Sequence, residues 1–174
     1  MKKINPWEAN DLAGDYEERG FHPTKWEEVT EFDEEGYGWV CTDNGWGFVN
    51  QEGYLVIPDD YEMIQYPFFE NGYCIAKKEG KLGIFDRKNH EVFPFIYDQL
   101  LGDLSAENPK VVVALNGKWE MMDIHRNTIL PLEYDDIFGF NDKFIIASKN
   151  NKYGLIDYQE NIIIDFKWDH LEFV

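Results

Sequence analysis

The amino-acid sequence predicts an all-β fold. About four repeats of three short antiparallel strands are expected to form a propeller-like or open β-array, with one extra strand at the N-terminal end. An aromatic residue recurs at steps of 35, 36, 37 and 34 residues, a proline column keeps the same steps, and two strand-like runs joined by a turn precede each proline position after the first. Periods of about 20 to 50 residues are typical of repeat architectures, in which each repeat buries apolar surface against the next.

The N-terminal region is expected to differ from the repeats. Residues 1–20 are predicted to form a cap, in which Asn5 and Pro6 suit the start of a short helix, and residues 21–174 form a single repeat domain. The first proline-bearing strand, at 21–29, has no companion strands before it. We expect this extra strand to cap or close the array, because an uncovered sheet edge promotes aggregation.

Each full unit is predicted to contain a strand, a tight turn, a second strand, a second turn and a proline-bearing strand. The first strands are 37–42, 73–78, 111–116 and 144–149. The second strands are 46–50, 82–86, 119–123 and 153–157. The third strands are 55–64, 91–100, 127–137 and 162–171. Glycine or asparagine stands in the tight turns, where φ is positive, and proline in the third strand predicts an edge or a bulge because proline cannot donate to a β-ladder.

Two columns of the repeat are predicted to be packing positions. In the column that opens the second strand, Leu82 replaces an aromatic residue, so the position requires apolar volume and not a flat ring. Its members are Trp46, Leu82, Trp119 and Tyr153, followed by Gly47, Gly83, Glu120 and Gly154. The other column holds Trp26, Tyr61, Tyr97, Tyr134 and Trp168, three residues after Pro23, Pro58, Pro94, Pro131 and Asp165. Its tyrosine hydroxyls are expected to reach backbone partners.

An acidic residue follows the second aromatic column in every copy. These acids are Glu27, Glu62, Asp98, Asp135 and Asp169. Carboxylates stacked in one line would repel each other, so either each one accepts hydrogen bonds from turn N–H groups or the units splay radially as in a propeller. A row of calcium sites is the less favoured interpretation, because no unit has the dense spacing of oxygen ligands that calcium needs.

The repeated motif resembles that of a known family. A Trp-Gly step that opens a strand, an Ile-Pro step after it, and a Tyr-Asp step three residues beyond the proline are similar to the WG (KWG) repeat family of bacterial β-rich proteins. The resemblance extends from about residue 21 to the C-terminus, with departures at Leu82, Glu120, Tyr153 and Asp165. It implies an all-β repeat fold and a role in binding, without a conserved catalytic site.

The composition argues against several classes of partner. The chain carries 16 Lys and Arg against 34 Asp and Glu, a net charge of −18. This charge repels phosphate backbones and anionic lipids, so neither a nucleic-acid nor a membrane partner is expected. No signal-peptide pattern or long apolar run is present, and Cys41 and Cys74 are too few for a disulfide framework, so we expect a cytoplasmic protein.

No catalytic, metal or cofactor site is predicted. The histidines occupy different places in the repeat and form no zinc spacing with the cysteines; they are His22, His90, His125 and His170. Ser105 and Ser148 lie outside any GxSxG motif, and there is no phosphate-binding glycine loop. Acid pairs such as Asp135 with Asp136 are expected by chance among 34 acids. We therefore expect no enzyme activity.

The acidic N-terminal stretch and the aromatic residues beside it form the predicted partner-binding surface. Its residues are Glu17, Glu18, Glu27, Glu28, Glu31, Asp33, Glu34, Glu35, Tyr37, Trp39, Phe69 and Glu70. Rings anchor an interface and charges steer association, so the expected partner is a basic protein. Most concretely, this predicts a stoichiometric immunity-type inhibitor of a basic toxin such as a nuclease, monomeric when alone. The alternatives are a glycan or small-ligand binder, a purely structural assembly module, and an acidic face that only maintains solubility.

Overall fold

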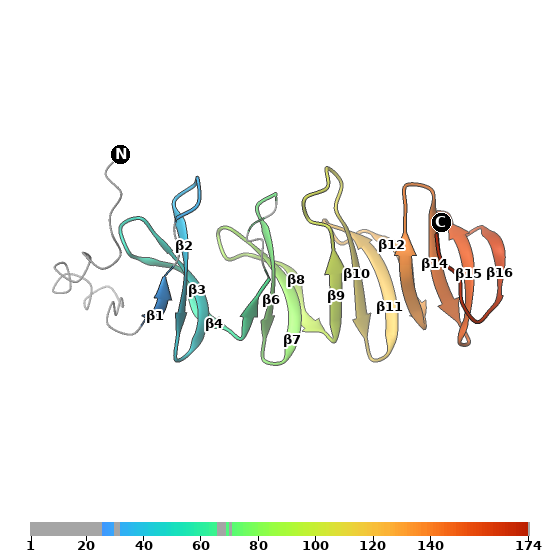
Figure 1. Cartoon of the computed structure of the whole chain (residues 1–174), viewed down its shortest axis with the longest axis horizontal. Coiled ribbons are helices and arrows are strands. Elements are labelled where there is room, and N and C mark those ends of the chain that lie inside the picture. The colour runs from blue at the N-terminus through green and yellow to red at the C-terminus, as the bar shows by residue number, and fades with distance from the viewer. Residues whose placement is uncertain (1–25, 30–31, 66–68, 70, 174) are drawn as a thin grey trace. The chain divides into compact units, whose positions relative to one another are not determined.

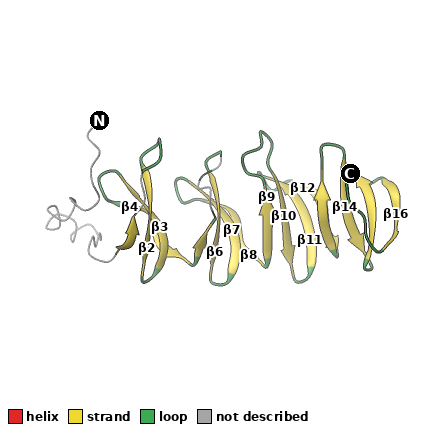
Figure 2. Ribbon diagram, viewed as in Figure 1, coloured by secondary structure: helices red, strands yellow, loops and turns green. Residues whose placement is uncertain are grey.

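The computed structural model describes residues 26–29, 32–65, 69 and 71–173 (Figure 1). Strands β1 to β16 run through this part of the chain, which contains no helix (Figure 2). The cap predicted at 1–20 lies outside the described residues. The prediction of an all-β repeat fold is confirmed.

The strands form four sheets of four strands, and none of these described sheets closes into a barrel. The first sheet has the order β1 (Trp26–Val29), β2 (Tyr37–Thr42), β3 (Gly45–Asn50), β4 (Leu55–Tyr61). The second has β5 (Met63–Ile64), β6 (Tyr73–Lys78), β7 (Lys81–Asp86), β8 (Glu91–Tyr97). The third has β9 (Gln99–Gly102), β10 (Lys110–Leu115), β11 (Lys118–Asp123), β12 (Thr128–Tyr134). The fourth has β13 (Asp136–Phe140), β14 (Phe144–Lys149), β15 (Lys152–Asp157), β16 (Ile162–Trp168).

Each sheet contains one strand more than the predicted unit. The chain bends at the acid that follows the aromatic column, and the residues beyond the bend pair with the first strand of the next unit, as Asp136 does opposite Ser148. The extra N-terminal strand follows the same scheme, because β1 pairs with β2 as the outer strand of the first sheet. In the sequence the two strands look like one run because a single residue separates them, for example Asp135 between β12 and β13.

Two compact units make up the chain. The first consists of residues 1–80 and 85–91, and the second of residues 81–84 and 92–174. In each unit, inner strands carry buried side chains on both faces of the sheet; in β10, every residue from Val111 to Ala114 is buried. A sheet of this kind is stable only when other apolar residues cover both of its faces.

Aromatic rings fill the core of the first unit. The Phe69 ring centroid lies 4.7 Å from that of Phe48 and 5.8 Å from that of Phe85. Tyr61 stacks on Phe85 with 4.8 Å between the centroids. Each ring pair of this kind contributes about 0.5 to 1.5 kcal/mol beyond the burial of its area. Tyr61, the member of the aromatic column that lies in β4, thus packs on Phe85, which comes later in the chain.

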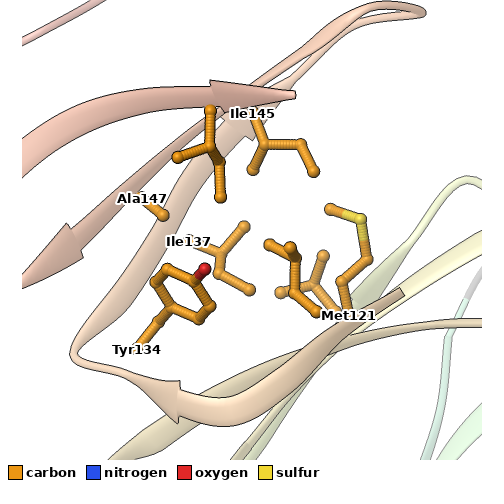
Figure 3. Close-up of a cluster of buried hydrophobic side chains, with 8 residues drawn as sticks. Met121, Tyr134, Ile137, Ile145 and Ala147 are labelled. Atoms are coloured by element: carbon orange, nitrogen blue, oxygen red, sulfur yellow. The ribbon is translucent and has the colours of Figure 1, made fainter. Parts of the chain in front are cut away.

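In the second unit, the third and fourth sheets share one apolar core (Figure 3). From the third sheet this core takes Val112, Met121, Leu130 and Tyr134. From the fourth sheet it takes Ile137, Ile145, Ala147 and Ile156. Each of these side chains is at most 5% exposed, so the face of one sheet is sealed by the face of the next.

The described proline positions lie on edge strands, as predicted, and Pro58 and Pro131 lie beside bulges; Pro23 lies outside the described residues. Strands β4, β8, β12 and β16 each end their sheet. Between the pairs Trp46–Tyr61 and Phe48–Ile57, β4 advances by four residues while β3 advances by two, so β4 bulges around Pro58. The fourth sheet has the same shift although Asp165 replaces the proline, which shows that the bulge does not depend on proline alone.

In the first and fourth sheets, the glycine after the column that opens the second strand lies close against this bulge, whereas the third sheet has the same shift with Glu120 at the equivalent position. A Cβ added at Gly47 would lie 2.7 Å from the carbonyl oxygen of Ile57, and one at Gly154 would lie 2.8 Å from the carbonyl oxygen of Ile164. Real Cβ atoms essentially never come so close to backbone atoms. At Gly47 and Gly154, a packing residue is therefore followed by a position where the bulged neighbour leaves no room for a side chain.

We expect Gly154→Ala to destabilise the protein by about 2 kcal/mol, because the new methyl group must push the β16 backbone away. Gly139→Ala is the matched control in the same sheet, since its Cβ would lie 3.8 Å from the nearest heavy atom, in Phe173. Urea unfolding of both variants measures the difference. Equal losses for the two variants would contradict the proposed role of the bulge.

Candidate partner-binding surface

The structure describes only part of the predicted partner-binding set. Glu17, Glu18, Glu31 and Glu70 lie outside the described residues. Glu27 and Glu28 lie in β1, where the backbone alone is described. The remaining residues are Asp33, Glu34, Glu35, Tyr37, Trp39 and Phe69, all in the first unit.

Asp33 organises the loop that carries the predicted acids. Its Oδ1 accepts the N–H groups of Glu35 at 3.0 Å and Tyr37 at 2.9 Å, and its carbonyl oxygen accepts the N–H of Gly36 at 3.0 Å. Gly36 has a φ of +87°, a left-handed conformation that glycine adopts without strain. The loop is therefore a defined turn, and Glu34 stands exposed at its tip.

Arg87 holds this loop against the turn between β7 and β8. Its Nη1 lies 2.9 Å from Asp33 Oδ2, and its Nε lies 3.3 Å from Glu35 Oε2 without forming a hydrogen bond. The guanidinium carbon lies 5.0 Å from the ring centroid of Tyr37 and 4.5 Å from that of Phe69. Two carboxylates and two rings thus surround one cation, an arrangement that suits the planar guanidinium. No sequence motif indicated this role for Arg87.

The aromatic members of the predicted surface do not protrude as expected. Phe69 is only 5% exposed and belongs to the core of the first unit, because it fits between the rings of Phe48 and Phe85. Trp39 is half-buried, with its ring centroid 4.7 Å from that of Trp46. Tyr37 is half-buried beside Arg87. The structure therefore brings Asp33, Glu35, Tyr37 and Phe69 together around Arg87 and leaves Trp39 on a separate contact.

A turn that follows each second strand recurs in all four sheets. Its first residue is Asn50, Asp86, Asp123 or Asp157, which accepts the N–H groups of the residues two and four positions later. Burial raises the pKa of Asp123, but hydrogen bonds from the Asn127 side chain and from turn N–H groups outweigh burial, and the pKa falls below its usual value. Sequence reasoning missed this column, although its steps of 36, 37 and 34 match those of the repeat.

The acids after the aromatic column also serve the fold. Asp98 accepts the N–H of Asn116 at 2.8 Å, Asp135 accepts that of Asn151 at 2.9 Å, and Glu62 accepts that of Gly80 at 2.7 Å. Each donor lies in the tight turn of the sheet that follows the bend. Of the two predicted explanations for this column, hydrogen bonding to turn N–H groups is the one that the structure shows.

A lysine column completes this arrangement, and sequence reasoning missed it as well. The Nζ of Lys81 lies 2.5 Å from Asp98, and that of Lys118 lies 2.6 Å from Asp135. Lys152 pairs with Asp169 in the same way. In all three pairs the lysine opens the second strand and precedes the acid by 17 residues, a spacing that the sequence displays. Asp98, Asp135 and Asp169 therefore form ion pairs with lysines of the same chain.

Two tyrosines of the aromatic column donate to side chains and not to the backbone, contrary to the expectation. The Tyr61 hydroxyl lies 2.8 Å from Asn89 Oδ1, and the Tyr134 hydroxyl lies 2.8 Å from Glu160 Oε2. Asn89 and Glu160 have φ values of +61° and occupy the same place in the turn after the second strand. Burial, first of all, raises the pKa of Tyr134, and the Glu160 carboxylate raises it further.

The described residues contain two cysteines and no cluster suited to a metal ion. No group of three or more His, Cys, Asp or Glu side chains among them could hold a metal ion. Cys41 is half-buried and Cys74 is buried, and the two do not form a disulfide. Within the same residues, no helix has the length and apolar character that crossing a membrane requires.

Comparison with known proteins identifies the repeat. The family model described as "WG containing repeat" matches residues 23–46, 46–81, 83–119, 121–153 and 153–174. No curated protein matches the chain. A solved structure titled "KlHsv2 with loop 6CD replaced by a Gly-Ser linker" is similar with a TM-score of 0.42 and 12% sequence identity, over 77% of this chain and 49% of that one. The chain spans about half the length of that structure.

We expect Asp135→Asn to lower stability at neutral pH and to weaken the loss of stability in acid. The Lys118 ammonium, together with the Asn151 N–H, holds the pKa of Asp135 below its usual value. Its stabilising contribution is therefore present above about pH 4 and is lost as pH falls through the lowered pKa. Urea midpoints measured across this range test the sign. Asp142→Asn, an exposed acid that makes neither contact, is the control, and an equal effect of both changes would refute the role of Asp135.

We expect Arg87→Ala to cost about 1 to 3 kcal/mol, because it removes the cation between two carboxylates and uncovers the Phe69 ring. Lys88→Ala, which changes an exposed neighbour of equal charge, should stay within about 0.5 kcal/mol. Thermal unfolding compares the two variants. If the Arg87 variant unfolds at the same temperature as the Lys88 variant, the contacts of Arg87 contribute nothing to stability.

Proposed function

The chain belongs to the WG-containing repeat family, and from this premise we propose that it is a non-catalytic module that binds a basic protein in equal stoichiometry. The all-β repeat fold is that of a repeat-type binding module. The most concrete form of the proposal is an immunity-type inhibitor that masks a basic toxin such as a nuclease.

The excess of acidic over basic residues is the main support for this proposal. Even if each of the 16 Lys and Arg residues neutralised one carboxylate, 34 − 16 = 18 acids would remain in excess. The structure uses several lysines in this way, including Lys81, Lys118 and Lys152. A field of this sign attracts a basic partner and accelerates its association.

The proposed contact lies on the 33–37 loop. Asp33, Glu34 and Glu35 carry three carboxylates, and Arg87 supplies one cation, which leaves a local charge of −2. Because Asp33 and Arg87 fix the turn, a partner would meet charges that are already in place, and less conformational entropy is lost on binding. The exposed Glu34 is the acid most available to a basic side chain.

The proposal is tested by capture followed by kinetics. The tagged protein is incubated with host lysate at low ionic strength, and the proteins that elute as salt rises are identified. We expect one basic protein in near-equal amount, with an association rate that falls steeply with salt because the attraction is screened. If the folded protein retains no basic protein, the proposal is wrong.

Two variants of equal net charge locate the contact. Glu34→Gln should slow association with the captured protein several-fold, since rim charges act mainly on the association rate. Glu107→Gln removes one exposed carboxylate from the second unit and should change the rate far less. If the two variants slow association equally, the 33–37 loop is not the contact.

A further inference from the structure

Asparagine stands directly before glycine at three steps in the sequence. They are Asn44–Gly45, Asn71–Gly72 and Asn116–Gly117. An Asn-Gly step is able to react with itself, because the glycine nitrogen bears no shielding side chain and the glycine backbone turns freely. The reaction requires that the glycine N–H and the asparagine side-chain amide are both free to move. The folded structure therefore decides which of the three steps reacts.

Hydrogen bonds and strand pairing hold the first two of these steps in place. Gly45 belongs to β3 and lies in its ladder with β2. The side-chain amide of Asn44 donates to Asp59 Oδ2 at 3.3 Å. At the second step, the N–H of Gly72 donates to the carbonyl oxygen of Phe69 at 3.1 Å. Reaction at either step would first have to break these contacts.

The third step is held far less. Asn116 and Gly117 form the two-residue loop between β10 and β11, which the pair Leu115–Lys118 closes. Their φ values of +51° and +76° are those of a tight hairpin turn. Both residues are exposed, and among the described residues neither the Gly117 N–H nor the Asn116 side-chain amide has a hydrogen-bond partner. Both reacting groups are therefore free at this step.

The acid that anchors the third-sheet hairpin explains why the glycine N–H is free. In the fourth sheet, Asp135 accepts the N–H of Asn151, the second residue of the equivalent loop, at 2.9 Å. In the third sheet, Asp98 instead accepts the N–H of Asn116, the first residue of the loop, at 2.8 Å. The anchor lies one residue earlier, so the N–H of Gly117 is left to solvent.

We propose that Asn116 is a site of spontaneous deamidation in the folded protein, and that this modification loosens the turn that Asp98 holds. A bond forms between the Gly117 nitrogen and Asn116 Cγ, the Cγ–Nδ2 bond breaks, and ammonia leaves with the proton of the Gly117 N–H. Water then opens the resulting cyclic imide. Opening at Cγ gives aspartate, and opening at the main-chain carbonyl carbon gives isoaspartate.

Both products disturb the hairpin. Each places a new carboxylate near Asp98, whose Oδ2 lies 2.8 Å from the backbone nitrogen of Asn116, and like charges at neighbouring positions are unfavourable. Isoaspartate also adds a methylene group to the main chain of a loop that has only two residues, which shifts the backbone N–H away from Asp98. The modified chain is therefore expected to be less stable, and it carries one more negative charge.

Peptide mapping by mass spectrometry tests the site in the purified full chain, incubated at neutral and at mildly alkaline pH. The same incubation in urea gives the reaction of the unfolded chain, in which the hydrogen bonds of the fold are absent. We expect folding to slow deamidation at Asn44 and Asn71 at least about tenfold more than at Asn116. The rate at Asn116 should rise with pH, because the attacking nitrogen must lose its proton. Equal protection of all three steps would overturn the proposal.

Gly117→Asn is the matched control, because it gives this hairpin the Asn-Asn sequence of the fourth sheet. There Asn150 and Asn151 have φ values of +54° and +58°, so the variant is expected to keep the turn. The added side chain shields the attacking nitrogen, and deamidation at Asn116 should fall at least about tenfold. A variant that reacts at the rate of the unchanged chain would show that the Gly117 nitrogen is not the nucleophile, and the proposal would be wrong.

Urea unfolding tests the effect on the turn. Anion exchange separates the modified chain from the unmodified chain by its additional charge, and the modified chain should unfold at a lower urea concentration. Asn108→Asp adds the same charge at an exposed position in the loop between β9 and β10, at the other end of β10, and should leave the midpoint unchanged. If the modified chain and the Asn108 variant unfold together with the unmodified chain, deamidation does not loosen the hairpin.

Discussion

The structure depends on the burial of sheet faces by neighbouring sheets. In β10, Val111 and Val113 point to one face and Val112 and Ala114 to the other, and all four are buried. A four-stranded sheet with two apolar faces is not stable alone, since each exposed face would forfeit about 25 cal/mol for every Å² left in water. The shared core around Tyr134 and Ile145 shows how the next sheet meets this need. In the second unit, the third and fourth sheets therefore each stabilise the other.

The acids after the aromatic column fix the point where the chain leaves one sheet for the next. Asp135 is held by Lys118 of the third sheet and by the Asn151 N–H of the fourth, so a single carboxylate ties together two sheets that are already in apolar contact. The apolar core alone is indifferent to small sliding motions, whereas hydrogen bonds to a charged group are directional. The column thus supplies the register of the packing, and Asp98 repeats the arrangement with Lys81 and the Asn116 N–H.

The repeat and most strands could be predicted from sequence because they depend on local patterns: the period, the alternation and the turn residues. The bend at Asp135 could not, because it has no sequence signal other than the acid and depends on pairing with a later strand. Phe69 was misjudged for a related reason. The acids beside it in sequence suggested exposure, but Phe48 and Arg87, distant in the chain, enclose it. The lysine column, by contrast, was visible as a 17-residue spacing and was overlooked.

These contacts change how the net charge should be interpreted. Contacts within the folded chain stabilise the carboxylate of an acid such as Asp135, so its removal would first affect folding. Glu34 stands at the tip of a turn that other residues build, so its removal changes the field around the protein and leaves the turn in place. The same residue type thus serves the scaffold in one place and the surface in another. Only carboxylates of the second kind can report on a partner, and the structure, not the composition, tells the two kinds apart.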